Sequence, residues 1–536
     1  MLNLIDKIGN WNPQLFRELK GRLKPGSVAI ALITSLGFQF IIFLCKYEEL
    51  SDENNQIDVL LWEHWKWIYL SLSIIFIFTL LVASTYLIVN DLSQEERQGT
   101  LNFIRLSPQS EISIFTGKML GVPVLIHLIV LAAIPFHIFA GIKANISLDY
   151  ILFFYLILVA SCILCYSLAL LFAIFDNSAF NGRKAFLGSG CILFLLILSM
   201  SGVHFDLEYS NAWFKILSPI EMTNYLFLNF SYNSELINLQ FFNLPLGKNV
   251  VSLLAFYLIN YGLLTYWIWQ GLKRCFRNPS ATMLNKQQSY FLVANFNFIH
   301  LGFVISTNDT IHNPVWGRLI YLYIWNICFF MALFAMILPH RQAIVDWATF
   351  RYKKVSNSKV SSQKSLLPDL IFGEKSPATL AIAINLIIAA SFFVIPIFNK
   401  DINTVKNGDQ IVALLGILLF VSLTMIYATI AQIMLMLKNS KRTLWAVGAT
   451  SASIILPVII LMILDISASN TGDVGSIFWL FTISFWHGIK NASYATVLSV
   501  FLCELTIVGL LNWYLVKQVT LAGESATKAL FANSKS

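Results

Sequence analysis

Long apolar runs alternate with shorter polar stretches along nearly the whole chain. Many of these runs are roughly twenty residues long, which is the length that an α-helix needs to cross the hydrocarbon core of a bilayer. Because lipid offers no hydrogen bonds to the backbone, such runs are expected to be helical. The pattern therefore predicts an all-α polytopic membrane protein with about twelve transmembrane helices.

The expected spans are 28–45, 67–89, 119–142, 150–175, 185–203, 250–272, 291–306, 319–338, 380–398, 411–437, 444–464 and 493–516. The run 291–306 is short and contains Asn295, Asn297 and His300. It is taken as a crossing because the basic segments around it and the next span would otherwise fall on opposite sides of the membrane. The run 477–489 is too short for a firm assignment as a crossing, and we interpret it as re-entrant or interfacial.

The polar segments divide the chain into regions. Residues 1–27 are predicted to hold an amphipathic connecting helix at the membrane surface, since Leu15, Leu19 and Leu23 share one face. A first transmembrane half, 28–272, contains a polar stretch at 90–118 and an external segment at 204–249, which is either a plain loop or a set of helices dipping into the outer leaflet. Basic segments, two spans and a linker at 340–378 occupy 273–378. A second half, 379–516, and a tail, 517–536, complete the chain.

Composition agrees with this topology. The chain is 57% apolar and 12% charged, whereas a soluble globular domain is about a quarter charged. The net charge of +8 does not indicate nucleic acid, because most Lys and Arg residues fall in the segments that the topology places in the cytoplasm. Both termini are expected inside, and residues 1–27 do not resemble a signal peptide.

Catalytic and metal-binding patterns are missing from the sequence. Cys162 and Cys165 form a CxxC inside an expected span, with no second CxxC and no histidine nearby to complete a metal site. His300 and His487 are interpreted as packing residues. No P-loop, HExxH or GxSxG motif occurs. We therefore expect no enzyme activity, no metal and no cofactor in this chain itself.

The most informative polar stretch is 90–118, which lies between the second and third expected spans. It predicts a short helix with Asp91 or Ser93 as N-cap, and with Glu95 and Glu96 in the first turn. Leu101, Ile104 and Leu106 are expected to make apolar contacts, and Pro108 is expected to end the run. A second amphipathic piece, 111–116, leads to Gly117 and Lys118 at the membrane boundary. A plain loop between two spans would also be polar.

The spacing within this stretch resembles the coupling helix of type-2 ABC exporter permeases. The resemblance is carried by Glu95-Glu96-x-x-Gly99-Thr100-Leu101, then Ser107-Pro108, then Gly117-Lys118 directly before a span. It implies a permease subunit in a plasma (bacterial inner) membrane. It also implies that residues 95–110 dock into a cleft on a separate cytoplasmic P-loop ATPase dimer, which would bind ATP and Mg²⁺. The substrate is not indicated.

A weak internal repeat bears on stoichiometry. Pro25-x-x-x-Ala29-Ile30-Ala31 matches Pro377-x-x-x-Ala381-Ile382-Ala383. If the repeat is real, the chain holds two fused half-permeases that form a pseudo-dimer, and 438–445 corresponds to 90–118. Otherwise two copies of the chain pair. The sequence leaves both arrangements open.

One acidic residue suggests a different class of function. Glu504 lies inside the last expected span, and a carboxylate at such depth is costly unless it faces protein or water. It would suit an ion- or proton-coupled secondary transporter, or it forms a structural hydrogen bond between helices.

Overall fold

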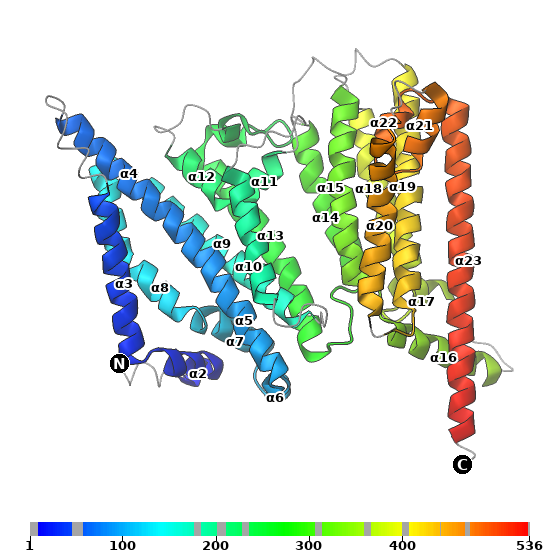
Figure 1. The fold of residues 1–536 in the computed structure, drawn as a ribbon, viewed down its shortest axis with the longest axis horizontal. Coiled ribbons are helices and arrows are strands. Elements are labelled where there is room, and N and C mark those ends of the chain that lie inside the picture. The colour runs from blue at the N-terminus through cyan, green and yellow to red at the C-terminus, as the bar shows by residue number, and fades with distance from the viewer. Residues whose placement is uncertain are drawn as a thin grey trace. The chain divides into compact units, whose positions relative to one another are not determined.

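The computed structural model describes residues 9–45, 57–175, 184–200, 211–227, 235–305, 314–357, 366–398, 407–439, 441–466 and 472–533. These residues form two compact units (Figure 1). Unit 1 comprises essentially the chain up to Pro279, and unit 2 essentially the chain from Ser280 onward. The linker that the sequence placed at 340–378 lies within unit 2.

Helices dominate both units, and no strand occurs among the residues that the structure describes. In the same residues, eleven helices are long and apolar enough to cross a membrane. The prediction of an all-α polytopic membrane protein is thus confirmed. The expected span at 185–203 corresponds to a shorter apolar helix, and the weak run 291–306 lies within a helix of sufficient length.

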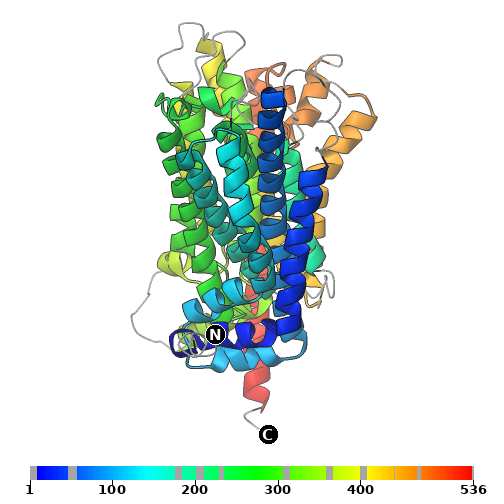
Figure 2. The ribbon, with the colours of Figure 1, turned by 90° about the vertical axis from the view of Figure 1, so that its left-hand side faces the viewer.

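Unit 1 begins with α2, which lies across one end of the bundle formed by the longer helices (Figure 2). Its helices are α2 (Pro13–Arg22), α3 (Pro25–Leu44), α4 (Ile57–Phe78), α5 (Ser84–Arg97), α6 (Thr100–Leu106), α7 (Glu111–Gly121), α8 (Val124–Lys143), α9 (Leu148–Ile174), α10 (Lys184–Met200), α11 (Asn211–Leu217), α12 (Pro219–Leu226) and α13 (Val250–Arg277). The short helices α11 and α12 fall in the segment 204–249, and much of the rest of that segment is outside the described residues.

The second membrane helix of unit 1 is continuous through a π-helical turn. Residues Thr79–Ala83 form this turn between α4 and α5. An open apolar hollow of about 620 Å³ lies beside it, and Phe78, Tyr86 and Phe186 are among the side chains that line it. A π-helical turn inserts an extra residue into the helix, and such turns are frequent at functional sites.

Unit 2 contains α14 (Lys286–Ile305), α15 (Pro314–Ile337), α16 (Arg341–Asn357), α17 (Leu366–Phe372), α18 (Thr379–Val394), α19 (Asn407–Leu435), α20 (Arg442–Ile463), α21 (Gly472–Leu480), α22 (Trp486–Ile489) and α23 (Tyr494–Asn533). The helices α21 and α22 occupy the run 477–489 and are both too short to cross a bilayer. Residues 517–533 of the expected tail continue α23 as one helix.

Candidate functional site: the segment between the second and third helices of unit 1

The polar stretch 90–118 does not begin with a helix cap. Helix α5 runs without a break from Ser84 to Arg97, so Asp91 and Ser93 lie inside it. The prediction of an N-cap at either residue was therefore wrong, because the second membrane helix simply continues into the polar stretch. Two residues after the end of α5 comes Gly99, whose φ of +73° is left-handed. Glycine adopts that conformation without the steric cost that a Cβ would bring.

The short helix α6 has one buried and one exposed face. Leu101 and Ile104 are buried, at 3% and 9% exposure, and α6 packs against α5. Phe103 and Leu106 lie on the other face, at 78% and 84% exposure. The expectation that Leu106 makes a packing contact was wrong, because it follows Phe103 by three residues and shares the outward face. Helix α6 ends at Leu106, two residues before Pro108, as expected.

Most of the remaining motif residues make hydrogen bonds or ion pairs within the segment or with its neighbours. The Thr100 hydroxyl donates to the Glu95 carbonyl at 3.1 Å, and the Ser107 hydroxyl donates to the Ile104 carbonyl at 2.8 Å. Pro108 is exposed. The Glu96 carboxylate pairs with Lys184 of α10 at 3.1 Å. Apart from Pro108, these groups stabilise the turn and its neighbours and leave the outward face of α6 to Phe103 and Leu106.

Helix α2 packs closely against α7. A Cβ on Gly117 would lie 2.8 Å from the Leu15 backbone nitrogen, and one on Gly121 would lie 2.5 Å from the Glu18 Cβ. The backbones can approach this closely only because both positions are glycine. Asn12 caps α2, since its Oδ1 accepts from the Leu15 N–H at 3.0 Å, and its Nδ2 donates to the Ser113 carbonyl at 2.8 Å.

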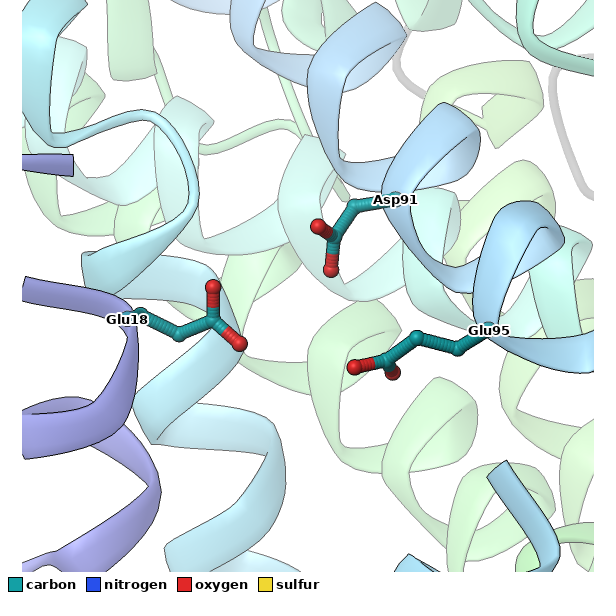
Figure 3. Close-up of side chains that lie close together, drawn as sticks. All are labelled: Glu18, Asp91 and Glu95. Carbon is teal, nitrogen blue, oxygen red and sulfur yellow. The ribbon is translucent and has the colours of Figure 1, made fainter. Parts of the chain in front are cut away.

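A buried lysine lies where α2, α5 and α7 meet. The Lys118 side chain is 2% exposed. Its Nζ lies 2.8 Å from Glu18 Oε1, 2.5 Å from Asp91 Oδ2 and 2.8 Å from Glu95 Oε1. The three carboxylates point toward one another from α2 and α5 (Figure 3). One ammonium with its three N–H donors therefore joins three helices.

Two arginines complete this cluster. Arg17 Nη2 lies 2.6 Å from Glu95 Oε1, and Arg22 Nη2 lies 2.6 Å from Asp91 Oδ1. Three carboxylates thus face three cations, so the formal charges of the cluster cancel. A buried ionic group is tolerable only when it is paired and hydrogen-bonded in this way. We call these residues (Arg17, Glu18, Arg22, Asp91, Glu95 and Lys118) the Lys118 cluster.

The neighbouring charges keep Glu18 and Lys118 ionised. Burial acts to raise the pKa of Glu18, but the Lys118 ammonium and the Arg17 guanidinium outweigh it and leave that pKa below its ordinary value. Burial likewise acts to lower the pKa of Lys118, yet the carboxylates of Asp91, Glu18 and Glu95 raise it above its ordinary value. Glu18 and Lys118 are therefore both charged across the neutral range.

The same three carboxylates have oxygens within 4.8 Å of one another, a spacing that would suit a metal ion. The Lys118 ammonium contacts all three of them. The ammonium therefore supplies the positive charge that a bound metal ion would otherwise supply, and the geometry favours an ion-pair cluster over a metal site.

The end of α13 also holds the segment in place. Arg277 Nε pairs with Glu111 Oε1 at 2.5 Å, and its Nη2 donates to the Gln109 carbonyl at 3.2 Å. The rings of Phe115 and Phe276 meet edge to face at 4.9 Å. The residues on either side of α6 are thus held in place by contacts with α2, α5, α10 and α13.

Sequence reasoning found the segment and named Lys118 within it, but it missed the pairing of Lys118 with Glu18 and the close approach at Gly121. Glu18 lies in α2, far along the chain from Lys118 and Gly121 of α7, and no local pattern brings the two helices together. The outward pair Phe103 and Leu106 had a readable signal, because it lies at i, i+3 on the face opposite Leu101 and Ile104.

The Glu504 carboxyl lies in unit 2 and is 0% exposed. The Ser422 hydroxyl of α19 donates to its Oε2 at 2.5 Å. Its Oε1 is buried without a hydrogen-bond partner among the described residues. The structure therefore places Glu504 between α23 and α19, far along the chain from the residues of the Lys118 cluster.

No protein-family model, curated protein or solved structure matches the chain.

Proposed function

We propose that the chain is the membrane-spanning subunit of an ABC exporter and that α6 docks onto a separate P-loop ATPase. The observation that carries the proposal is the outward face of α6, where two large apolar side chains stand almost fully exposed on a short helix in a polar stretch. Exposure of such an apolar pair to water is energetically unfavourable and is typical of a surface that binds another protein. The motif resemblance of residues 95–118 independently points to an ATPase as that contact.

The Lys118 cluster supports a mechanical role for this segment. A docked partner that pulls on α6 would pull on α5, which continues directly into the membrane. It would also pull on α2 and α7 through the buried ion pairs, because separating those charges is costly. Closure of the ATPase on ATP would thus shift the membrane helices between states, as a population shift driven by nucleotide binding.

Orientation and location follow from the same proposal. The docking segment lies in the cytoplasm, together with both termini, and the membrane is the plasma (bacterial inner) membrane. The excess of Lys and Arg in the segments assigned to the cytoplasm supports this orientation. The apolar hollow beside the π-helical turn would accept a lipid-like or drug-like substrate.

Affinity purification of the tagged chain in mild detergent tests the proposal. We expect a protein with a P-loop to co-purify with the wild type and to be lost in the double variant Phe103→Glu, Leu106→Glu. The matched control is Phe103→Leu, Leu106→Met, which keeps the apolar face and should keep the partner. Charge reversal at Glu95 would instead disrupt the Lys118 cluster. Absence of any P-loop protein from folded wild type would contradict the proposal.

A second candidate function is an ion- or proton-coupled secondary transporter. The specific observation is Glu504, which is fully buried and has Ser422 as its hydrogen-bond partner. This candidate requires transport that does not depend on ATP, that changes with pH and that is abolished by Glu504→Gln. ATP-dependent transport that survives this substitution would exclude it.

A further inference from the structure

The helices of unit 2 follow the same order as those of unit 1. Among the described residues, unit 1 has five apolar helices long enough to cross a membrane and the shorter apolar helix α10, and unit 2 has six long apolar helices. In both units, short helices follow the second and the fifth of these six helices. In unit 1 the six are α3, α4–α5, α8, α9, α10 and α13, and the short helices are α6, α7, α11 and α12. In unit 2 the six are α14, α15, α18, α19, α20 and α23, and the short helices are α17, α21 and α22, with the longer polar helix α16 beside α17.

The packing inside the two units also corresponds. In unit 1, α3 packs against α8, α5 against α9, and α9 against α13. In unit 2, α14 packs against α18, α15 against α19, and α19 against α23. These are the first–third, second–fourth and fourth–sixth pairs in both cases. The third and fifth helices differ. Helix α8 also packs against α4, whereas α18 also packs against α19, and α10 packs mainly against α5, whereas α20 packs mainly against α19.

This correspondence sets a register for the repeat that differs from the motif match. It pairs α3 with α14 and α8 with α18, so α16 and α17 take the place of α6 and α7. The match between Pro25 and Pro377 would instead pair the first helix of unit 1 with the third helix of unit 2. Chain order and three packing pairs together are stronger evidence than four identical residues in apolar sequence.

We infer that unit 2 is a second permease half and that α16–α17 is a second docking segment for the ATPase. The inference rests on the proposed function and adds its stoichiometry. One copy of this chain binds both subunits of an ATPase dimer, the first at α6 and the second at α16–α17.

The helices α16 and α17 carry exposed apolar side chains, and α16 is held in place by a buried apolar face. Helix α16 buries Ile344 and Ala348 against α19 and α23. Phe350 on α16 is 68% exposed, and three apolar residues around α17 are also exposed, namely Leu366, Leu367 and Phe372. An exposed apolar set in this position repeats the arrangement of Phe103 and Leu106 in unit 1.

Polar contacts with α16 and α14 anchor α17 within unit 2. Arg351 Nη1 of α16 lies 2.7 Å from Asp369 Oδ2. Lys286, at the start of α14, is 2% exposed and donates to the Leu370 carbonyl at 2.8 Å, the Ser376 hydroxyl at 2.7 Å and the Pro377 carbonyl at 3.0 Å. A lysine buried among neutral oxygens is costly, and here it joins the first membrane helix of unit 2 to the segment before the third. In unit 1, the buried Lys118 lies in the segment before the third helix, but its partners are carboxylates of α2 and α5.

The experiment titrates the ATPase subunit, identified by its P-loop peptide and produced separately, onto the purified full chain, and it counts bound copies by native mass spectrometry. We expect two ATPase subunits on one wild-type chain. We expect one on Leu367→Glu, Phe372→Glu, one on Phe103→Glu, Leu106→Glu, and none on the combined variant. Leu367→Met, Phe372→Leu is the matched control and should bind two. Size-exclusion profiles and melting temperatures must match the wild type before the counts are compared.

The outcomes separate this inference from the proposed function. If the α17 variant still binds two subunits, or if two chains share one ATPase dimer, the inference is overturned while the proposed function stands. Failure of the wild type to bind any ATPase would overturn both proposals.

Discussion

The Nζ of Lys118 lies 2.8 Å from Oε1 of Glu18, which ties α7 to an interfacial helix distant in the sequence. Because the same ammonium also contacts two carboxylates of α5, the second membrane helix is joined to both. The three helices meet at one buried charge, so movement of any one of them requires the others to follow or the ion pairs to break. The Lys118 cluster, the contact between α2 and α7 and the turn at Gly99 can each be tested by substitution.

Removal of the Lys118 charge should destabilise unit 1. Lys118→Met leaves three acidic groups facing one another with only two arginines, and breaking a buried pair costs about 3–5 kcal/mol. Thermal unfolding in detergent should show a clear drop in melting temperature. Lys20→Met, an exposed lysine of α2, is the control and should melt like the wild type. Equal melting of both variants would show that the Lys118 cluster is not formed.

Enlarging Gly121 should push α2 away from α7. A Cβ at this position would lie 2.5 Å from the Glu18 Cβ, and overpacking of this kind costs about 1–3 kcal/mol. Gly121→Ala should therefore lower the melting temperature and expose α2 to limited proteolysis. Gly37→Ala in α3 has no atom within 4 Å of the added Cβ, so it should leave both measurements unchanged.

Substitutions of Gly99 should be limited by the left-handed backbone conformation rather than by steric contacts of the new side chain. No atom lies within 4 Å of an added Cβ, yet φ is +73°, and an alanine in the left-handed region costs about 1–2 kcal/mol. We expect Gly99→Ala to weaken ATPase binding in the titration because it redirects α6. Asn tolerates the left-handed region better, so Gly99→Asn should bind more strongly than Gly99→Ala. The reverse order would contradict this account.

Acid should weaken unit 1 through Glu18. Its folded pKa is lowered, so its contribution to stability is fully present above the ordinary carboxyl pKa and is lost as the pH falls toward the lowered value. Melting temperature should decline below about pH 5, and Glu18→Gln should decline less steeply. Asp149→Asn, which removes an exposed carboxylate of α9, should keep the wild-type profile. The raised pKa of Lys118 predicts no matching loss on mild alkalinisation, because its contribution is fully present below the ordinary lysine pKa and is lost only as the pH rises from there through the raised value.

Hydropathy along the sequence was enough to predict the helical membrane fold, most of its spans and the position of the segment between the second and third helices. Each of those inferences depends only on the summed hydropathy of residues adjacent in the sequence. The free-energy cost of placing an unpaired backbone group or a charge in lipid is large, so this local sum is enough to predict a span. The weak run 291–306 was placed instead by the basic segments around it and the next span, which have to fall on the same side of the membrane.

The tertiary structure decided which residues of that segment face inward. Asp91 was predicted to be a cap but lies inside α5 and pairs with Lys118, and Glu95, a predicted docking residue, also pairs with Lys118. Leu106 was predicted to pack and is exposed. The register of the internal repeat also follows from packing pairs rather than from the match at Pro25. These features depend on contacts between residues far apart in the chain, whose energies come from burial and charge pairing that exist only once the helices have packed.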